Sequence, residues 1–140
     1  MSHFRTRGEV WIYDRLAGDA TLAGMGITPS RIFDTIGRGA GNYVVFQYQA
    51  GVDINGSGTI RIMGSLLFVI KVSGENVSKA ALEPIADRVD ELIHGYAANT
   101  ADGYRVEARR EQEIALPPVI DGDVVTREIG GLYRLFVHRV

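Results

Sequence analysis

The clearest hydrophobic pattern in the chain is a stripe that repeats with the period of a helix, about 3.6 residues. Its members are Ile85, Ala86, Val89, Leu92 and Ile93. Pro84 lacks an amide hydrogen and belongs near the first turn, while Gly95 is suited to close the helix. Asp90 and His94 lie four residues apart and could pair. The pattern predicts a long amphipathic helix at about 78–94, packed on a sheet.

A weaker pattern predicts a short helix at about 7–17. Thr6 and Glu9 have the spacing of a capping box, in which each side chain bonds the other's backbone amide. Gly8 lies in the first turn and weakens that interpretation, whereas Gly18 fits a C-terminal cap. A single further turn is expected near residues 21–23.

The remaining hydrophobic positions alternate with a period of two, as in strands. Strands are predicted at about 31–36, 43–49, 59–72, 104–114, 124–128 and 131–140. In the longest segment the core face is expected to contain Ile60, Ile62, Leu66, Phe68, Ile70 and Val72.

Turn signals separate these predicted strands. Residues 50–58 are predicted to be a flexible loop that turns at Asn55-Gly56. Leu116-Pro117-Pro118 is expected to end one strand, because proline cannot donate to the ladder, and residues 121–123 form a turn. Strands that cluster instead of alternating with helices favour an α+β fold with a mainly antiparallel sheet. Residues 1–140 are predicted to be a single domain of this kind.

Composition narrows the function classes. The net charge of -2 and hydrophobic content of 46% describe a globular chain without a strongly basic face. The absence of cysteine removes disulfides, thiolate nucleophiles and cysteine zinc sites, and suits assembly in a reducing cytoplasm. The N-terminus has no apolar signal-peptide core, and the run LLFVI is too short to cross a bilayer. We therefore expect no membrane partner.

The glycine-rich stretch GRGAGN, residues 37–42, is the one candidate for ligand chemistry. Arg38 lies between glycines and could contact phosphate, but Asn42 stands where a dinucleotide fingerprint needs its third glycine, and a strand follows instead of a helix. We favour a bent connection between two strands. The alternative is a small ligand-binding or enzymatic α+β domain that uses the Gly37–Gly41 loop.

No other reactive constellation is present in the sequence. The three histidines His3, His94 and His138 lack metal-ligand spacing, and no serine lies in a nucleophile elbow. We predict no catalytic residues, no metal and no cofactor. A row of alternating charges remains, at Arg105, Glu107, Arg109, Glu111 and Glu113. It fits either a solvated edge strand protected against stray pairing or mixed charges facing a neighbouring subunit.

The chain as a whole resembles the phage tail completion or tail terminator proteins. The resemblance is carried by residues 13–47, from YDRLAGDATL to YVVFQ, by LLFVIKVSGENVSKAALEPIADRVDELIHG at 66–95, and by the ending DGDVVTREIGGLYRLFVHRV. Many members have a proline where this chain has Asn42. These motifs are patterns of residue class and contain no chemical signature.

The resemblance implies a structural subunit without enzymatic activity. Such proteins form a ring, commonly hexameric, that ends the tail tube at the head-proximal end of the virion tail and receives the head connector or neck protein. DNA would meet the protein only by passing through the lumen. Candidate residues for subunit contacts or for the lumen are Arg38, Asp53, Asn55, Arg105, Glu107, Arg109 and Glu111. A nucleic-acid-binding module is disfavoured, because glutamates alternate with the arginines.

Overall fold

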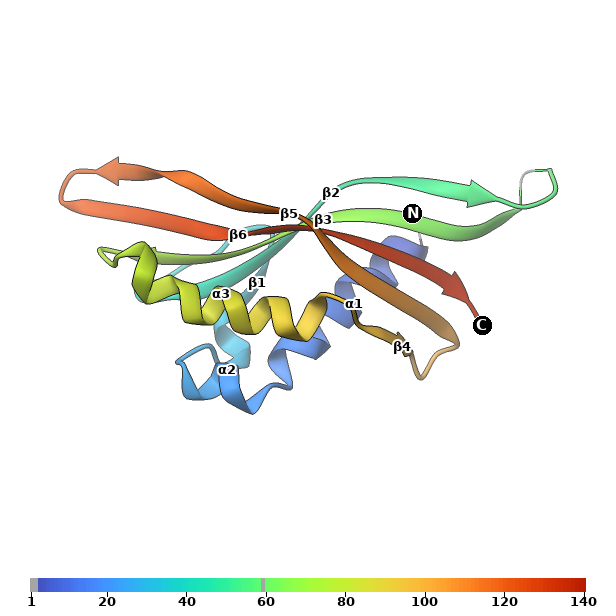
Figure 1. The fold of residues 1–140 in the computed structure, drawn as a ribbon, viewed down its shortest axis with the longest axis horizontal. Coiled ribbons are helices and arrows are strands. Elements are labelled where there is room, and N and C mark those ends of the chain that lie inside the picture. The colour runs from blue at the N-terminus through green and yellow to red at the C-terminus, as the bar shows by residue number, and fades with distance from the viewer. Residues whose placement is uncertain (1–2, 59) are drawn as a thin grey trace.

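The computed structural model describes residues 3–58 and 60–140, which form one curled, six-stranded sheet with helices against one side (Figure 1). The elements are α1 (His3–Ala17), α2 (Ala20–Gly24), the 3-10 turn η1 (Pro29–Arg31), β1 (Ile32–Asp34), β2 (Tyr43–Asn55), β3 (Arg61–Glu75), α3 (Lys79–Ile93), β4 (Ala97–Asn99), β5 (Tyr104–Asp121) and β6 (Val124–Arg139). The predicted α+β class is confirmed.

The sheet has the strand order β1-β2-β3-β6-β5-β4. The short β1 runs parallel to β2, and every other neighbouring pair is antiparallel. Two long hairpins, β2–β3 and β5–β6, are joined through the β3–β6 ladder, which extends from Met63↔His138 to Glu75↔Thr126. The result is a sheet made mostly of four long strands.

The core lies between the helices and one face of this sheet. The predicted stripe of α3 is confirmed, with Ile85, Val89, Leu92 and Ile93 buried. These side chains pack against buried sheet residues of alternating position, including Phe68 and Leu135. Ser78 caps the helix by accepting a hydrogen bond from the Ala81 amide at 3.2 Å.

Helix α1 begins four residues earlier than the predicted bound, at His3, so the capping-box interpretation of Thr6 and Glu9 is wrong. Gly8 lies inside the helix for a packing reason. A Cβ at that position would lie 3.1 Å from Leu66 Cδ1, so glycine lets the helix approach β3 closely. The single turn expected near residues 21–23 is confirmed as α2.

Strands β2, β5 and β6 are longer than predicted, because turn-forming residues lie inside them, whereas β1 at Ile32–Asp34 is shorter than the strand predicted at 31–36. Residues 50–55, expected in a flexible loop, continue β2 after a register shift near Gln49. Pro117 and Pro118 do not end β5 but lie at a second irregularity, between Leu116 and Val119. Strand β6 continues through Gly130 as well. Glycine is needed there because a Cβ would lie 2.1 Å from the Ile70 carbonyl oxygen of the neighbouring strand.

Two side-chain predictions are also wrong. Ile60 and Ile62, placed in the core by alternation, are 66% and 51% exposed, because the helical layer does not reach that end of β3. Thr59, the predicted start of the strand, lies outside the described residues. Asp90 bonds the Tyr133 hydroxyl at 2.9 Å instead of His94, whose Nδ1 accepts from the Arg110 amide at 2.8 Å.

Asp19 fastens two helices together. One carboxylate oxygen accepts from the Leu22 amide at 2.9 Å and so caps α2, and the two oxygens accept from Arg88 Nε and Nη2 at 3.0 and 2.7 Å. This paired geometry is the strongest form of an arginine–carboxylate contact. The Arg88 hydrogen bonds hold the pKa of Asp19 below its ordinary value.

Replacing Asp19 with asparagine tests this contact. Asparagine caps helices about as well as aspartate, so Asp19→Asn removes mainly the charge, and the expected loss of unfolding free energy at pH 7 is about 1 kcal/mol. Because the folded pKa is lowered, the stabilisation is present above the unfolded pKa, about 3.9, and disappears as the pH falls through the folded value.

Urea unfolding from pH 7 to pH 2.5 measures the effect. The gap between wild type and Asp19→Asn should close at the acid end. Asp87→Asn, at an exposed position of the same helix as Arg88, should leave the midpoint nearly unchanged. A gap that stays constant with pH would refute the assigned charge contribution.

Candidate assembly surfaces

Two hairpin arms extend beyond the helical layer at opposite ends of the sheet (Figure 1). Arm A consists of residues 50–58 and 60–62 of the β2–β3 hairpin, and arm B consists of residues 115–126 of the β5–β6 hairpin. More than half of the large exposed hydrophobic side chains among the described residues lie in these arms. They are Val52, Ile54, Ile60 and Ile62 in arm A, and Leu116, Val119, Ile120 and Val124 in arm B.

Arm A is apolar but electrically balanced. Val52 and Ile60 are 65% and 66% exposed. Its two charged groups pair with each other across the hairpin, with 3.1 Å between Arg61 Nε and Asp53 Oδ2. Asn55, a candidate from the sequence, is the last residue of β2 and lies opposite Arg61. The structure therefore brings Asp53 and Asn55 into one exposed hairpin.

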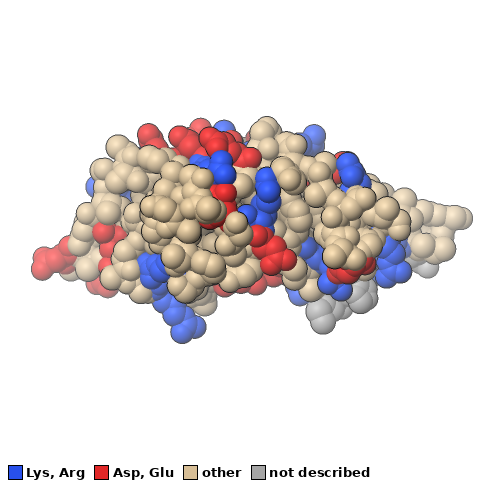
Figure 2. Space-filling view, turned by 90° about the horizontal axis from the view of Figure 1, so that it is seen from below, with Lys and Arg blue, Asp and Glu red and all other residues tan. Residues whose placement is uncertain are grey.

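Arm B combines apolar side chains with acidic charge at its tip. Val119 and Ile120 are 59% and 70% exposed, and Asp121 and Asp123 flank the turn at Gly122, where φ is +61°. Residues 115–126 contain no lysine or arginine. Figure 2 shows acidic atoms at the end of the molecule where this turn lies, and uncharged atoms at the opposite end.

Asn76 attaches the base of arm B to the body. Its amide donates to the Val125 carbonyl at 2.7 Å, and its side-chain oxygen accepts from the Val125 amide at 2.9 Å. The sequence predicted the turn at residues 121–123 but not the strand before it, because Pro117 and Pro118 were expected to end β5. The available signal was the hairpin pattern of apolar pairs on both sides of Asp121-Gly122-Asp123.

The sheet face opposite the helices, called here the open face, is the third exposed surface. Along β3 and β6 its side chains are half-buried where their neighbours on the core face are fully buried. Apolar members of this face, called here the apolar band, are Met63, Leu67, Val69, Leu132 and Phe136. Val69 pairs with Leu132, whereas Leu67 lies opposite Arg134 and Met63 opposite His138. No helix of the described residues packs on these side chains, since the helices contact the opposite, core face (Figure 1).

The predicted charged row lies beside this apolar band on β5 as far as Glu111. The prediction that Glu113 shares this face is wrong, because the register shift between Arg110 and Gln112 places Glu113 opposite Gly131, on the core side of the sheet. Several of its charges are paired within the subunit: Arg105 with Glu107 at 3.2 Å, and Glu111 with Arg134 at 2.8 Å. The Arg109 guanidinium lies 5.5 Å from the centre of the Phe136 ring. Strand β4 covers β5 at residues 105–107, and beyond Glu107 β5 is the outermost strand. The row is therefore exposed and carries both signs of charge, which fits a solvated edge strand and a contact with a neighbouring subunit equally well.

The glycine-rich stretch is a bent connection between β1 and β2, as favoured from the sequence. Arg31 holds it together by donating to three backbone carbonyls: Asn42 at 3.2 Å, Arg38 at 3.4 Å and Ala40 at 2.7 Å. A phosphate cradle presents amides, whereas these carbonyls face a cation. The Arg38 residue itself is exposed. A Cβ on Gly37 would lie 2.0 Å from the Tyr43 ring, which explains that glycine.

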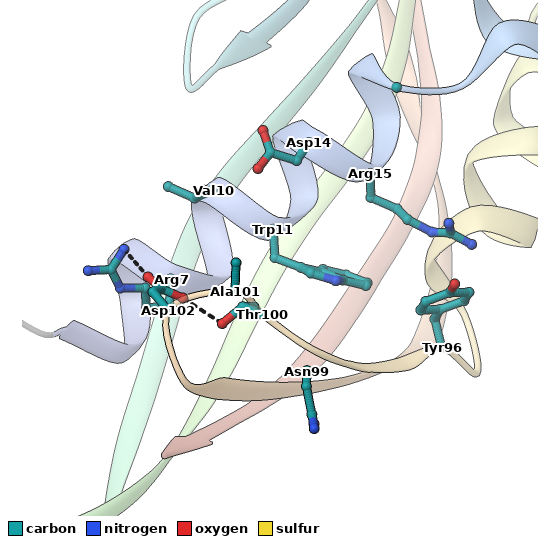
Figure 3. Close-up of a pocket in the computed structure, with 11 residues that line it drawn as sticks. Arg7, Val10, Trp11, Asp14, Arg15, Tyr96, Asn99, Thr100, Ala101 and Asp102 are labelled. Carbon is teal, nitrogen blue, oxygen red and sulfur yellow. Dashed lines mark hydrogen bonds and ion pairs between the residues drawn. The ribbon is translucent and has the colours of Figure 1, made fainter. Parts of the chain in front are cut away.

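A cavity of about 520 Å³ lies elsewhere, between α1 and residues 96–102 (Figure 3). Its lining is Arg7, Val10, Trp11, Asp14, Arg15, Gly18, Tyr96, Asn99, Thr100, Ala101 and Asp102. The Arg15 guanidinium lies 3.6 Å from the Tyr96 ring centre while its Nε donates to the Leu92 carbonyl at 2.9 Å. These contacts fasten α1 to the end of α3.

Several polar groups of this cavity form contacts within the subunit. Asp102 forms an ion pair with Arg7, and the Thr100 hydroxyl donates to it at 2.6 Å. That hydrogen bond is the main reason that the pKa of Asp102 is lowered. The lining contains no serine, cysteine or histidine.

One further carboxyl group, that of Glu9, has a raised pKa. Burial raises the pKa of Glu9, and the neighbouring Asp34 carboxyl raises it further. Among residues 3–58 and 60–140, no group of three or more potential metal ligands occurs. Within the same residues, no helix has the length and apolarity needed to cross a membrane.

The fold is shared with solved structures. A chain in the structure of a native gene transfer agent virion has a TM-score of 0.56 and 21% identity, with 91% of each chain covered. A second solved protein has a TM-score of 0.58 and 15% identity, with 96% of each chain covered. At such identities the comparisons establish a common fold over nearly the whole chain. No protein-family model and no curated protein sequence matches this chain.

The role of Arg31 in the glycine-rich stretch is testable by backbone NMR relaxation. Arg31→Gln should lower the order parameters of residues 37–42, because three backbone carbonyls lose their donor. Arg38→Gln is the matched control, since its exposed side chain makes no contact that holds the loop. Equal effects of the two substitutions would contradict the proposed anchoring.

Proposed function

We propose that this protein is a structural subunit of a phage or phage-like virion. More specifically, its copies form a ring that ends the tail tube at the head-proximal side and joins it to the head connector. The observation that carries the proposal is the shared fold, over 91% of both chains, with a component of a gene transfer agent virion. The chain-wide resemblance to tail terminator proteins supports the finer assignment.

The exposed surfaces support an assembling protein. Exposed apolar side chains that gather in one place commonly mark interaction sites, and in this subunit they gather on the two arms. The half-buried apolar side chains of the open face add a third surface without a helix over it. Each of these surfaces is partly rimmed by charges, as interfaces commonly are. Contacts with neighbouring copies, with the tail-tube protein and with the head connector would cover them.

The proposal involves no catalysis. In the cavity beside α1, Arg7, Asp102, Thr100 and Arg15 form contacts within the subunit, and the Gly37–Gly41 loop turns its carbonyls toward Arg31. The alternative of a ligand-binding or enzymatic domain at that loop therefore has less support than a structural role.

The candidate residues take different positions in this proposal. Asp53 and Asn55 belong to arm A and would contact a neighbouring copy. The row from Arg105 to Glu111 lies on the sheet edge beside the open face and would face either a neighbour or the lumen. Arg38 lies in the connection between β1 and β2 and would contact a neighbour or the lumen.

Assembly on tail tubes tests the proposal. Purified protein, added to polymerised tail tubes from the same phage-like particle, should bind at one tube end and stop further elongation. Negative-stain images should show a cap of ring shape at that end, and light scattering at high protein concentration should show a closed oligomer, which we expect to contain about six copies.

A matched control uses tubes whose ends are already capped. These should not take up more protein, whereas open tubes should saturate at one ring per end. Protein that ignores open tubes, binds along their sides, or remains monomeric under every condition would contradict the tail terminator role.

A further inference from the structure

Arm B is acidic at its tip whereas arm A is neutral, and this difference determines which arms of two copies can contact each other. Residues 115–126 of arm B contain Asp121 and Asp123 and no basic residue. Two such tips brought together would repel each other, and like charges at an interface are costly. Contact of arm B with arm B of another copy is therefore disfavoured, and arm B needs a different surface.

Arm A supplies a surface of matching character. Its charges cancel, since Asp53 pairs with Arg61 at 3.1 Å, and its apolar side chains are as exposed as those of arm B. A contact between two copies of arm A would leave every arm B uncovered. Contact of arm A with arm B is the pairing that covers both apolar surfaces without bringing like charges together.

The position of the arms fixes the symmetry of that contact. They lie at opposite ends of the same sheet (Figure 1), so one subunit can engage a neighbour at each end. A contact between two different surfaces is heterologous, and repeated copies then close into a ring or continue as a filament. An isologous contact would stop at a dimer.

The prolines of arm B indicate how the arms touch. Pro117 and Pro118 have no amide hydrogen and lie on the outermost long strand. They oppose the addition of another strand at this edge. The contact therefore runs through apolar side chains and not through a continued β-ladder. Val119 and Ile120 are consecutive strand residues and lie on opposite faces of arm B, so substituting both removes an apolar group from each face of that arm.

We propose that arm B of each subunit packs on arm A of the next copy, and that this heterologous contact generates the ring. The inference rests on the proposed function in that the partner is a second copy of this chain. It adds the surfaces, the direction of the contact and the residues that form it.

Two arm variants test the inference. The arm A variant carries Val52→Asp and Ile60→Asp, and the arm B variant carries Val119→Asp and Ile120→Asp. All four side chains are more than half exposed, so both variants should fold, which circular dichroism verifies. Analytical ultracentrifugation should find each variant monomeric at concentrations where the wild type assembles. An equimolar mixture should form a one-to-one dimer, because each mixed pair retains one intact arm A and one intact arm B.

The matched control is Ile36→Asp, because Ile36 is 70% exposed, as Ile120 is, but lies outside both arms. This variant should assemble as the wild type does. Three results would overturn the heterologous contact. The arm B variant could self-associate through arm A, the mixture could stay monomeric, or either variant could assemble as the wild type does. Wild-type rings that cap tubes despite such a result would leave the proposed function standing. Wild-type protein that never assembles, even on tubes, would overturn both.

Discussion

The length difference between helices and strands is the constraint on which the rest of the structure depends. The two long helices have 15 residues each, which at about 1.5 Å per residue is about 22 Å. Strand β5 has 18 residues, and at about 3.3 Å per residue it extends to about 60 Å. The helical layer therefore covers the middle of the sheet, and the ends of the long hairpins project without cover.

This mismatch divides the protein into a body and two arms. The body has a core that needs no partner, with Phe68, Leu135 and Ile93 fully buried and the helices fixed by contacts such as the Asp19–Arg88 pair. The arms have hydrogen-bonded backbones but expose isoleucine and valine side chains on both hairpins. Assembly would bury these arm side chains without opening the core of the body.

The sequence predicted the elements that follow one regular period. The stripe of α3, the alternation from Leu66 to Val72 and the single turn after Asp19 all appear as expected. These predictions succeed because one side of each element is buried against one core.

Errors arose where local turn chemistry and tertiary structure disagree. The loop expected from residue 50, the strand end expected at Pro117 and the gap expected between residues 128 and 131 were wrong, because strand pairing continues through Gly51, Pro117 and Gly130 at bulges or at close approaches between strands. The turn expected at Asn55-Gly56 does follow β2. Exposure of Ile62 could not be predicted from alternation, which gives the face of a strand but not the extent of the layer that covers it. The arms were therefore outside what the pattern alone reveals.

Hydrogen exchange of the free and assembled protein tests the central claim most directly. In the free subunit, amides of residues 50–55 and 115–126 should exchange faster than amides of residues 66–72 and 131–137 in the helix-covered middle of the sheet. Assembly should slow exchange in both arms at the same time. Two results would contradict this account: arms that are as protected as the middle of the sheet in the free protein, or arms whose exchange does not change on assembly.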